Sequence, residues 1–150
     1  ADVCGIVTRR SHSNGAPFQT NWPNEDFKEL YFYELSRKYG YSADTCLIFK
    51  TDIISRYHFP KIDGENFITE SVFYNQFIHD YRILASRNLY YVAESMPDGY
   101  TNQGMSLFFR NPQGYLYSIK QNLHVAIKNG YSFRTKCALS ANYYAWKKDK

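Results

Sequence analysis

Residues 58–114, which decide the fold class of this chain, read HFPKIDGENFITESVFYNQFIHDYRILASRNLYYVAESMPDGYTNQGMSLFFRNPQG. A Phe-Pro turn, a stretch with two glutamates, an aromatic helical pattern, a strand pattern and a Pro-Asp-Gly turn follow one another in this order. Strand and helix patterns that alternate along a chain are typical of α/β proteins. The stretch therefore predicts an α/β fold.

Three segments of the whole chain have the composition of strands, either apolar throughout or rich in Tyr and Val: residues 3–7, 45–49 and 89–93. We expect them to form a small mixed sheet of about three strands. Helical spacing of apolar residues predicts flanking helices over residues 25–39, from Thr69 to Leu84, and a helical C-terminal tail over residues 111–130 and 132–147.

The C-terminal tail has clear boundary signals. Asn111 is a suitable capping residue, and Pro112 suits the first position of the helix that follows. In the last helix one side carries apolar or small residues that we expect to be buried, namely Phe133, Cys137, Ala141 and Tyr144.

The composition predicts one globular domain of 150 residues, with 44% hydrophobic and 21% charged residues. A net charge of +4 is compatible with an anionic partner such as a nucleotide diphosphate or a membrane surface, but does not indicate nucleic-acid binding. The three cysteines, Cys4, Cys46 and Cys137, lack the spacing of a zinc or redox site, and we expect them to be buried thiols.

Two glutamates are the candidates for acid-base chemistry. Glu65 and Glu70 lie between a proline-directed turn and the start of a predicted helix, where a loop can present side chains to a cleft. A carboxylate can take the proton from an attacking hydroxyl group. From its position alone, Glu70 is better explained as an acidic residue that stabilises the first turn of a helix.

The stretch Gly64-Glu65-x-Phe67-Ile68-x-Glu70, within the order of elements above, resembles the C-terminal, acceptor-binding half of bacterial nucleotide-sugar glycosyltransferases. These enzymes form the large inverting family two and have the GT-A type of α/β fold. The specific part of the resemblance covers residues 41–114. Some members have Glu-Asp at the end of the stretch, with the Asp as base, whereas this chain has Ser71 after Glu70.

The resemblance implies a partial GT-A-like fold whose nucleotide-binding N-terminal half is absent, so that this chain alone would be an inactive fragment. The parent enzyme would transfer a sugar with inversion from a nucleotide sugar to a glycan or lipid-linked acceptor, in surface polysaccharide synthesis. Glu70 is the first candidate for the base and Glu65 the second. No cofactor is expected in this chain, and a divalent metal, Mg²⁺ or Mn²⁺, is implied for the parent.

The implied location is the cytoplasm, with a peripheral position at the inner face of the membrane as an option. Apolar surface left by the missing half would favour homo-oligomers. A second class of function stays open: a binding module without enzymatic activity that holds a carbohydrate or a protein on an aromatic surface, since 19% of the residues are aromatic. Single-stranded nucleic-acid binding is disfavoured because no basic cluster alternates with these aromatic residues.

Overall fold

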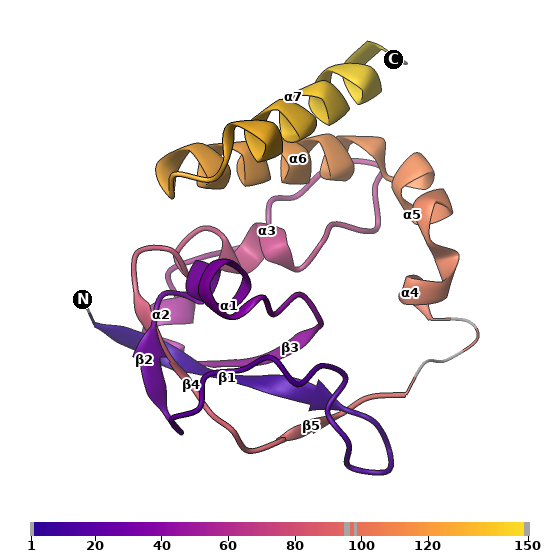
Figure 1. The fold of residues 1–150 in the computed structure, drawn as a ribbon. Coiled ribbons are helices and arrows are strands. Elements are labelled where there is room, and N and C mark those ends of the chain that lie inside the picture. Colours follow the sequence, from indigo (N-terminus) through magenta and orange to yellow (C-terminus); the bar gives the residue numbers. More distant parts are fainter. Residues whose placement is uncertain (1, 95–96, 98, 149–150) are drawn as a thin grey trace. The chain divides into compact units, whose positions relative to one another are not determined.

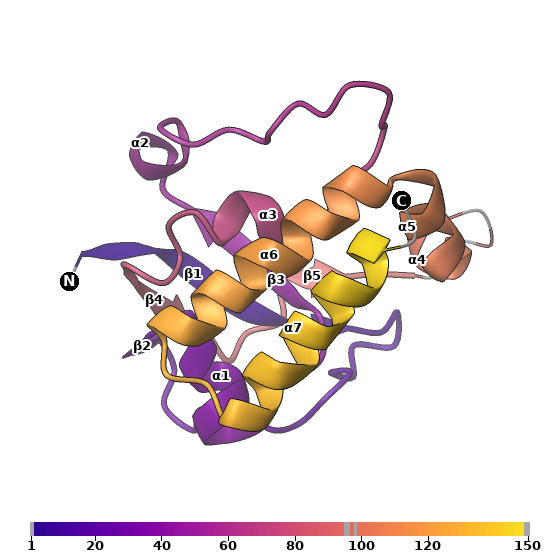
Figure 2. The same cartoon turned by 90° about the horizontal axis from the view of Figure 1, so that it is seen from above.

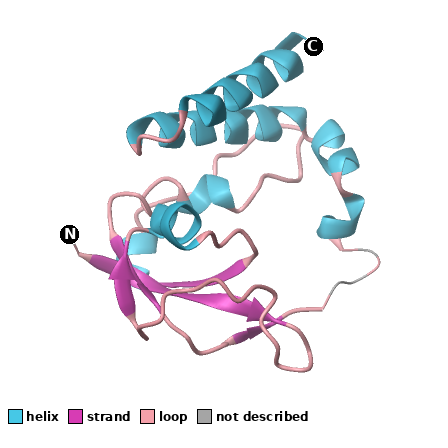
Figure 3. Ribbon diagram, in the orientation of Figure 1, coloured by secondary structure: helices cyan, strands magenta, loops and turns pink. Residues whose placement is uncertain are grey.

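The computed structural model describes residues 2–94, 97 and 99–148, so Asp98 of the expected Pro-Asp-Gly turn lies outside the described residues. The chain divides into two compact units (Figures 1 and 3). The first unit consists of residues 1–57 and 77–95, and it contains all the strands found in the described part of the chain. The second unit consists of residues 58–76 and 96–150, and it is helical.

The first unit is built on a mixed sheet of five strands, not the three expected: β1 (Val3–Ser11), β2 (Lys28–Leu30), β3 (Thr45–Phe49), β4 (Arg82–Ala85) and β5 (Tyr91–Val92). The strand order is β2-β4-β1-β3, and β5 pairs with the end of β1. β1 runs parallel to β4 and β5 but antiparallel to β3, and β2 runs antiparallel to β4. The expectation of an α/β protein with a small mixed sheet is therefore confirmed.

β1 is the central strand, and its apolar sequence follows from this position. Cys4 and Val7 are fully buried, and the neighbouring β4 adds buried Ile83 and Ala85. Gly5 allows β1 and β3 to approach closely, because a Cβ atom at Gly5 would lie 2.0 Å from the carbonyl oxygen of Ile48. A side chain at this position would force the two strands apart.

The expected helix over residues 25–39 is wrong in its first half. Helix α1 spans Phe32–Tyr39, because residues 28–30 pair with β4 as strand β2 instead. The Glu34 carboxylate accepts a hydrogen bond from the Tyr31 backbone N–H at 2.8 Å, and Gly40 ends the helix with φ 68°. Helix α2, Thr51–Ile54, completes the helices of this unit within the described residues.

The helix expected from Thr69 to Leu84 is also wrong. Only Ser71–Tyr74 is helical (α3), and residues 82–85 form β4. Apolar side chains in this region recur both at every second residue and at helical spacing, so the local pattern fits both structures. Pairing of β4 with β1, nearly 80 residues earlier in the sequence, decides the outcome.

The second unit contains α3, α4 (Tyr100–Gln103), α5 (Met105–Arg110), α6 (Pro112–Lys128) and α7 (Phe133–Lys148). Helices α6 and α7 lie side by side and run in opposite directions (Figure 2). Both helices of the expected C-terminal tail are thus confirmed to within two residues at each end. None of the described helices is long and apolar enough to cross a lipid bilayer.

The expected buried side of α7 faces outward instead. Phe133 is 83% exposed and Tyr144 is 61% exposed, and Cys137 and Ala141 between them are exposed as well. The opposite side of α7 carries Trp146, whose ring lies 4.5 Å from that of Tyr115 on α6. Helix α7 therefore has apolar residues on two sides, and the side with the larger ring packs inside the unit.

The cysteines are free thiols, as expected, but they are not all buried. Cys4 is buried, Cys46 is half-buried and Cys137 is exposed on α7. Burial raises the pKa of the Cys4 thiol, and it raises the pKa of the Cys46 thiol as well.

Candidate functional site

The carboxylate of Glu65 caps helix α6 from outside the helix. Its two oxygens accept the backbone N–H groups of Gln113 at 2.6 Å and Gly114 at 2.7 Å. The first N–H groups of an α-helix have no partner within the helix, and the helix dipole places partial positive charge there. Glu65 supplies both hydrogen bonds and the compensating negative charge.

Asn111 does not cap the helix that it precedes, contrary to expectation. Its side-chain oxygen accepts the backbone N–H groups of Asn66 at 2.9 Å and Phe67 at 3.1 Å. Its side-chain nitrogen donates to the Leu107 carbonyl oxygen at 2.8 Å, and the residue is only 6% exposed. The loop thus caps the helix through Glu65, and the start of the helix binds the loop through Asn111.

Gly114 makes this close contact possible. A Cβ atom at Gly114 would lie 2.9 Å from the carbonyl oxygen of Phe67 and 3.1 Å from a carboxylate oxygen of Glu65. Both distances are shorter than ordinary contacts to a side chain. We call Glu65, Phe67, Asn111 and Gly114 the capping cluster.

Aromatic side chains hold the same loop against the helices of the second unit. The Phe67 ring lies 6.0 Å from that of Phe108 and 5.3 Å from that of Tyr100, in edge geometry that suits aromatic pairs. The Phe108 ring in turn lies 4.4 Å from the ring of Tyr115. These ring contacts of Phe67 add to the hydrogen bonds of the capping cluster in fixing the loop.

The short helix α3 after this loop is tied to α6 by amide side chains. Asn75 donates to the side-chain oxygen of Asn122 at 3.0 Å, and Gln121 donates to the Val72 carbonyl oxygen at 3.0 Å. The segment that carries Glu70 is therefore fixed on both sides, by the capping cluster before it and by α6 after it.

Glu70 itself stands at the start of α3 and is exposed. Its backbone carbonyl accepts the N–H of Phe73 at 2.9 Å, but its carboxylate makes no hydrogen bond or ion pair with any described residue. A carboxylate in this state is solvated and can accept a proton. The two candidates thus differ: Glu65 is engaged through both oxygens, whereas the Glu70 carboxylate is available.

The first unit contains a cavity of about 450 Å³, and neither glutamate lines it. Its lining is polar and carries charges of both signs, from Asp2, Val3, Lys50, Asp52, Ile53, Arg56 and Tyr81. Within the described residues, no group of three or more His, Cys, Asp or Glu side chains is arranged to hold a metal ion.

The chain was compared with family models, with curated proteins and with solved structures. None of them matches. The candidate site therefore depends on the residues and contacts of this chain.

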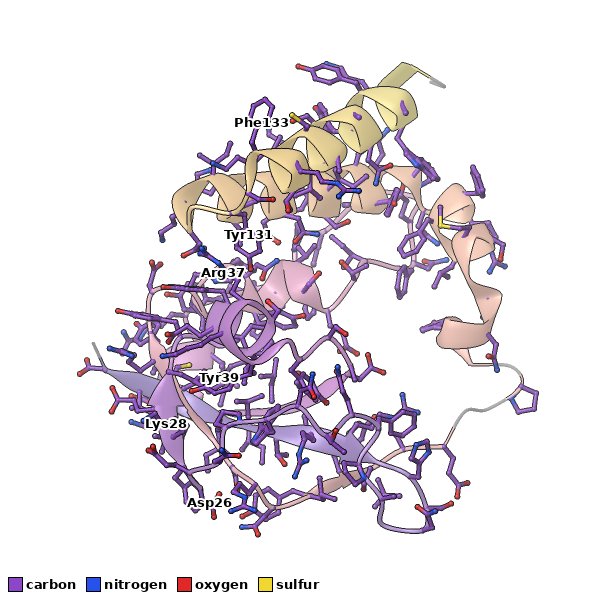
Figure 4. The ribbon with its side chains drawn as sticks, viewed as in Figure 1. Asp26, Lys28, Arg37, Tyr39, Tyr131 and Phe133 are labelled. Carbon is purple, nitrogen blue, oxygen red and sulfur yellow. The ribbon has the colours of Figure 1, made fainter. Side chains whose placement is uncertain are left out.

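Sequence reasoning missed Asp26, a further carboxylate with well-defined partners. One of its oxygens accepts hydrogen bonds from the backbone N–H of Arg87 at 2.6 Å, the Ser86 hydroxyl at 3.1 Å and the backbone N–H of Phe27 at 3.0 Å. These bonds, that from Arg87 first, lower the pKa of Asp26. Figure 4 shows Asp26 near the end of β2 that carries Lys28.

The Asp26 hydrogen bonds accompany an unusual backbone conformation. Phe27 has φ 51° and is the one residue other than glycine with a positive φ in the described part of the chain. The sequence indicates this turn only weakly, because Asn24-Glu25-Asp26 also resembles the start of a helix. Asp26 joins the turn before β2 to the end of β4, and this role is structural.

Proposed function

We propose that this chain forms the acceptor side of an inverting nucleotide-sugar glycosyltransferase with a GT-A-like fold, and that Glu70 is its general base. The observation that carries the proposal is the exposed, unengaged carboxylate of Glu70 on a segment fixed on both sides. The resemblance of residues 64–70 to the family supports the same assignment.

In the proposed reaction an acceptor hydroxyl loses its proton to the Glu70 carboxylate while its oxygen attacks the anomeric carbon of the donor sugar. The new bond between the acceptor oxygen and the anomeric carbon forms as the bond to the nucleotide diphosphate breaks. The attack comes from the side opposite the leaving group, so the configuration at the anomeric carbon is inverted. The proton ends on Glu70 and the negative charge on the departing nucleotide.

Glu65 has a different part in this proposal. Since both of its oxygens accept backbone N–H groups of α6, it acts as a positioning residue that holds the loop before Glu70. Binding of the donor and of any metal ion is assigned to parts of the parent enzyme that precede this segment. The acceptor class remains a glycan or a lipid-linked sugar.

The test is Glu70→Gln in the complete transferase that contains this segment. The change keeps the shape of the side chain but removes the proton acceptor, so we expect the turnover number to fall roughly 10²- to 10⁴-fold. The affinity for the nucleotide sugar should change little. Ser71→Ala, at the neighbouring position, is the matched control and should keep normal turnover.

Two results would contradict the proposal. Normal turnover of the Glu70→Gln enzyme would exclude Glu70 as the base. Glycan binding by this chain that requires neither nucleotide nor Glu70, together with absence of transfer by the longer protein, would instead support the carbohydrate-binding module.

A further inference from the structure

Helix α7 presents an apolar stripe to solvent. Phe133, Cys137, Ala141 and Tyr144 recur at intervals of four and three residues, so they lie on one side of the helix. All four are exposed, and Phe133 projects from α7 on the side away from α6 (Figure 4). A contiguous apolar surface is a sign of an interaction site, whereas apolar residues scattered singly are not.

Cationic side chains flank this stripe. Arg134 follows Phe133 by one residue, Lys147 follows Tyr144 by three, and both side chains are exposed. With 3.6 residues per helical turn, they fall on either side of the stripe. Lysine and arginine in such positions can direct their charges away from an apolar region while their aliphatic parts cover its margin.

The segment that contains α7 carries only positively charged side chains. Residues 99–148 contain no Asp or Glu, and all 14 acidic residues of the chain lie elsewhere. The same segment contains seven Lys and Arg residues, namely Arg110, Lys120, Lys128, Arg134, Lys136, Lys147 and Lys148. The net charge of +4 for the whole chain hides this asymmetry.

We propose that the outward stripe of α7 docks onto a lipid bilayer that carries anionic headgroups, with the helix lying along the surface. Exposed aromatic rings flanked by cations, on a helix without acidic residues, let burial of apolar surface and electrostatic attraction to anionic lipid act together. The anionic headgroups would pair with Arg134 and Lys147, and the rings of Phe133 and Tyr144 would enter the boundary of the acyl chains. This inference does not depend on the proposed glycosyl transfer.

The apolar stripe and the cations that flank it favour a lipid bilayer over a nucleic acid or a second copy of this chain as the binding partner of α7. A nucleic acid would require bases stacked on aromatic rings within a positively charged groove, and here the rings lie on the convex face of one helix. A second copy of this chain would bring the same acid-free face against itself, and the facing cations would repel one another. Anionic lipid accounts both for the apolar stripe and for the excess of Lys and Arg over acidic residues in this segment.

The test measures flotation of the 150-residue chain with vesicles of phosphatidylcholine, with and without phosphatidylglycerol. We expect binding to the anionic vesicles only, weakened by added salt. Phe133→Ser/Tyr144→Ser should bind at least about tenfold more weakly, because two exposed rings no longer enter the interface. Tyr90→Ser, which removes an exposed ring of the first unit, should bind normally.

A second pair of variants tests the charges. Arg134→Gln/Lys147→Gln should bind roughly 25-fold more weakly, since each cation near an anionic surface contributes about fivefold. Lys50→Gln/Lys61→Gln removes the same charge from exposed sites outside α7 and should bind like the unchanged chain. Because all these side chains are exposed, thermal unfolding should confirm that every variant is folded.

Cys137 lies within the stripe and reports on docking directly. Anionic vesicles should slow its reaction with a charged, water-soluble maleimide at least several-fold, and Cys137→Ser provides the background. The proposal is overturned if the unchanged chain ignores anionic vesicles, or if the Phe133→Ser/Tyr144→Ser variant binds them equally well. Self-association or binding to heparin through this face, without vesicle binding, would overturn it as well.

Discussion

Glu65 and Gly114 are joined by a hydrogen bond of 2.7 Å between carboxylate and backbone N–H, although 49 residues separate them in the sequence. The neighbouring Gln113 N–H binds the other oxygen of the same carboxylate. Pro112 has no N–H, and the N–H of Asn111 donates to the Phe108 carbonyl oxygen. Every N–H group of the first turn of α6 is thereby accounted for.

Substitution of Glu65 by Ala should therefore destabilise the protein by about 1–2 kcal/mol, because it leaves two backbone N–H groups at the helix start without their partner. Chemical denaturation provides the measurement. Glu70→Ala is the matched control and should change the free energy of unfolding by less than about 0.5 kcal/mol, since the Glu70 carboxylate has no partner among the described residues. Equal effects of the two changes would contradict the capping role of Glu65.

Gly114→Ala provides an independent test of the capping cluster. Alanine in a helix is normally favoured over glycine by about 1 kcal/mol, so the change would ordinarily stabilise the protein. Here we expect destabilisation of about 1–3 kcal/mol, because the new methyl group would lie 2.9 Å from the Phe67 carbonyl oxygen. Gln113→Ala, at an exposed site that keeps its N–H, should be nearly neutral. A Gly114→Ala protein as stable as the original would show that the loop and α6 are not in close contact.

The sequence predicted the elements whose signals are local. The strand at residues 45–49 and the two C-terminal helices were identified because their apolar pattern and boundary residues lie within the elements themselves. Strands β2 and β4 were not identified, because each is formed by pairing with a segment that is distant in the sequence. β2 has little apolar sequence of its own, and the apolar sequence of β4 fits a helix as well as a strand, so neither has a reliable local signal.

The candidate site, like the fold, was predictable only where its signals are local in the sequence. Glu65 and Glu70 could be named from residue type and position, but their different states depend on where the loop lies. The contact of Glu65 with the start of α6 connects segments far apart in the sequence. One indication was present: Gly114 occupies the first turn of a predicted helix, where glycine is unfavourable unless another group must approach closely.

The turn at Asp26 should make stability depend on pH under acidic conditions. The hydrogen bonds from Arg87, Ser86 and Phe27 lower the folded-state pKa of Asp26 below its unfolded value, which is about 4. The unfolded state therefore binds more protons in this range, so this contribution to stability is complete above pH about 4 and is lost as the pH falls through the folded-state pKa. Asp26→Asn should lower the Tm at neutral pH and flatten the decline of Tm below pH about 4.

Thermal unfolding followed by circular dichroism at several pH values provides the measurement for Asp26. Asp63→Asn is the control at neutral pH, because the Asp63 side chain is exposed and has no hydrogen-bond partner among the described residues. An Asp26→Asn protein with an unchanged Tm at neutral pH and an unchanged acid decline would show that these hydrogen bonds do not stabilise the turn.

The three cysteines should react with thiol reagents in the order of their exposure. Cys137 is exposed on α7, Cys46 is half-buried and Cys4 is buried in the central strand, where burial also raises the pKa of the thiol. The thiolate is the reactive form, so Cys4 is disfavoured both by access and by ionisation. In the absence of vesicles we expect Cys137 to be modified first and Cys4 only when the protein unfolds.

Mass spectrometry of peptides after brief exposure to iodoacetamide measures the order in which the cysteines react. Cys137→Ser should abolish the fast phase, and modification of Cys4 in the folded protein at the rate of Cys137 would contradict the position of β1 at the centre of the sheet.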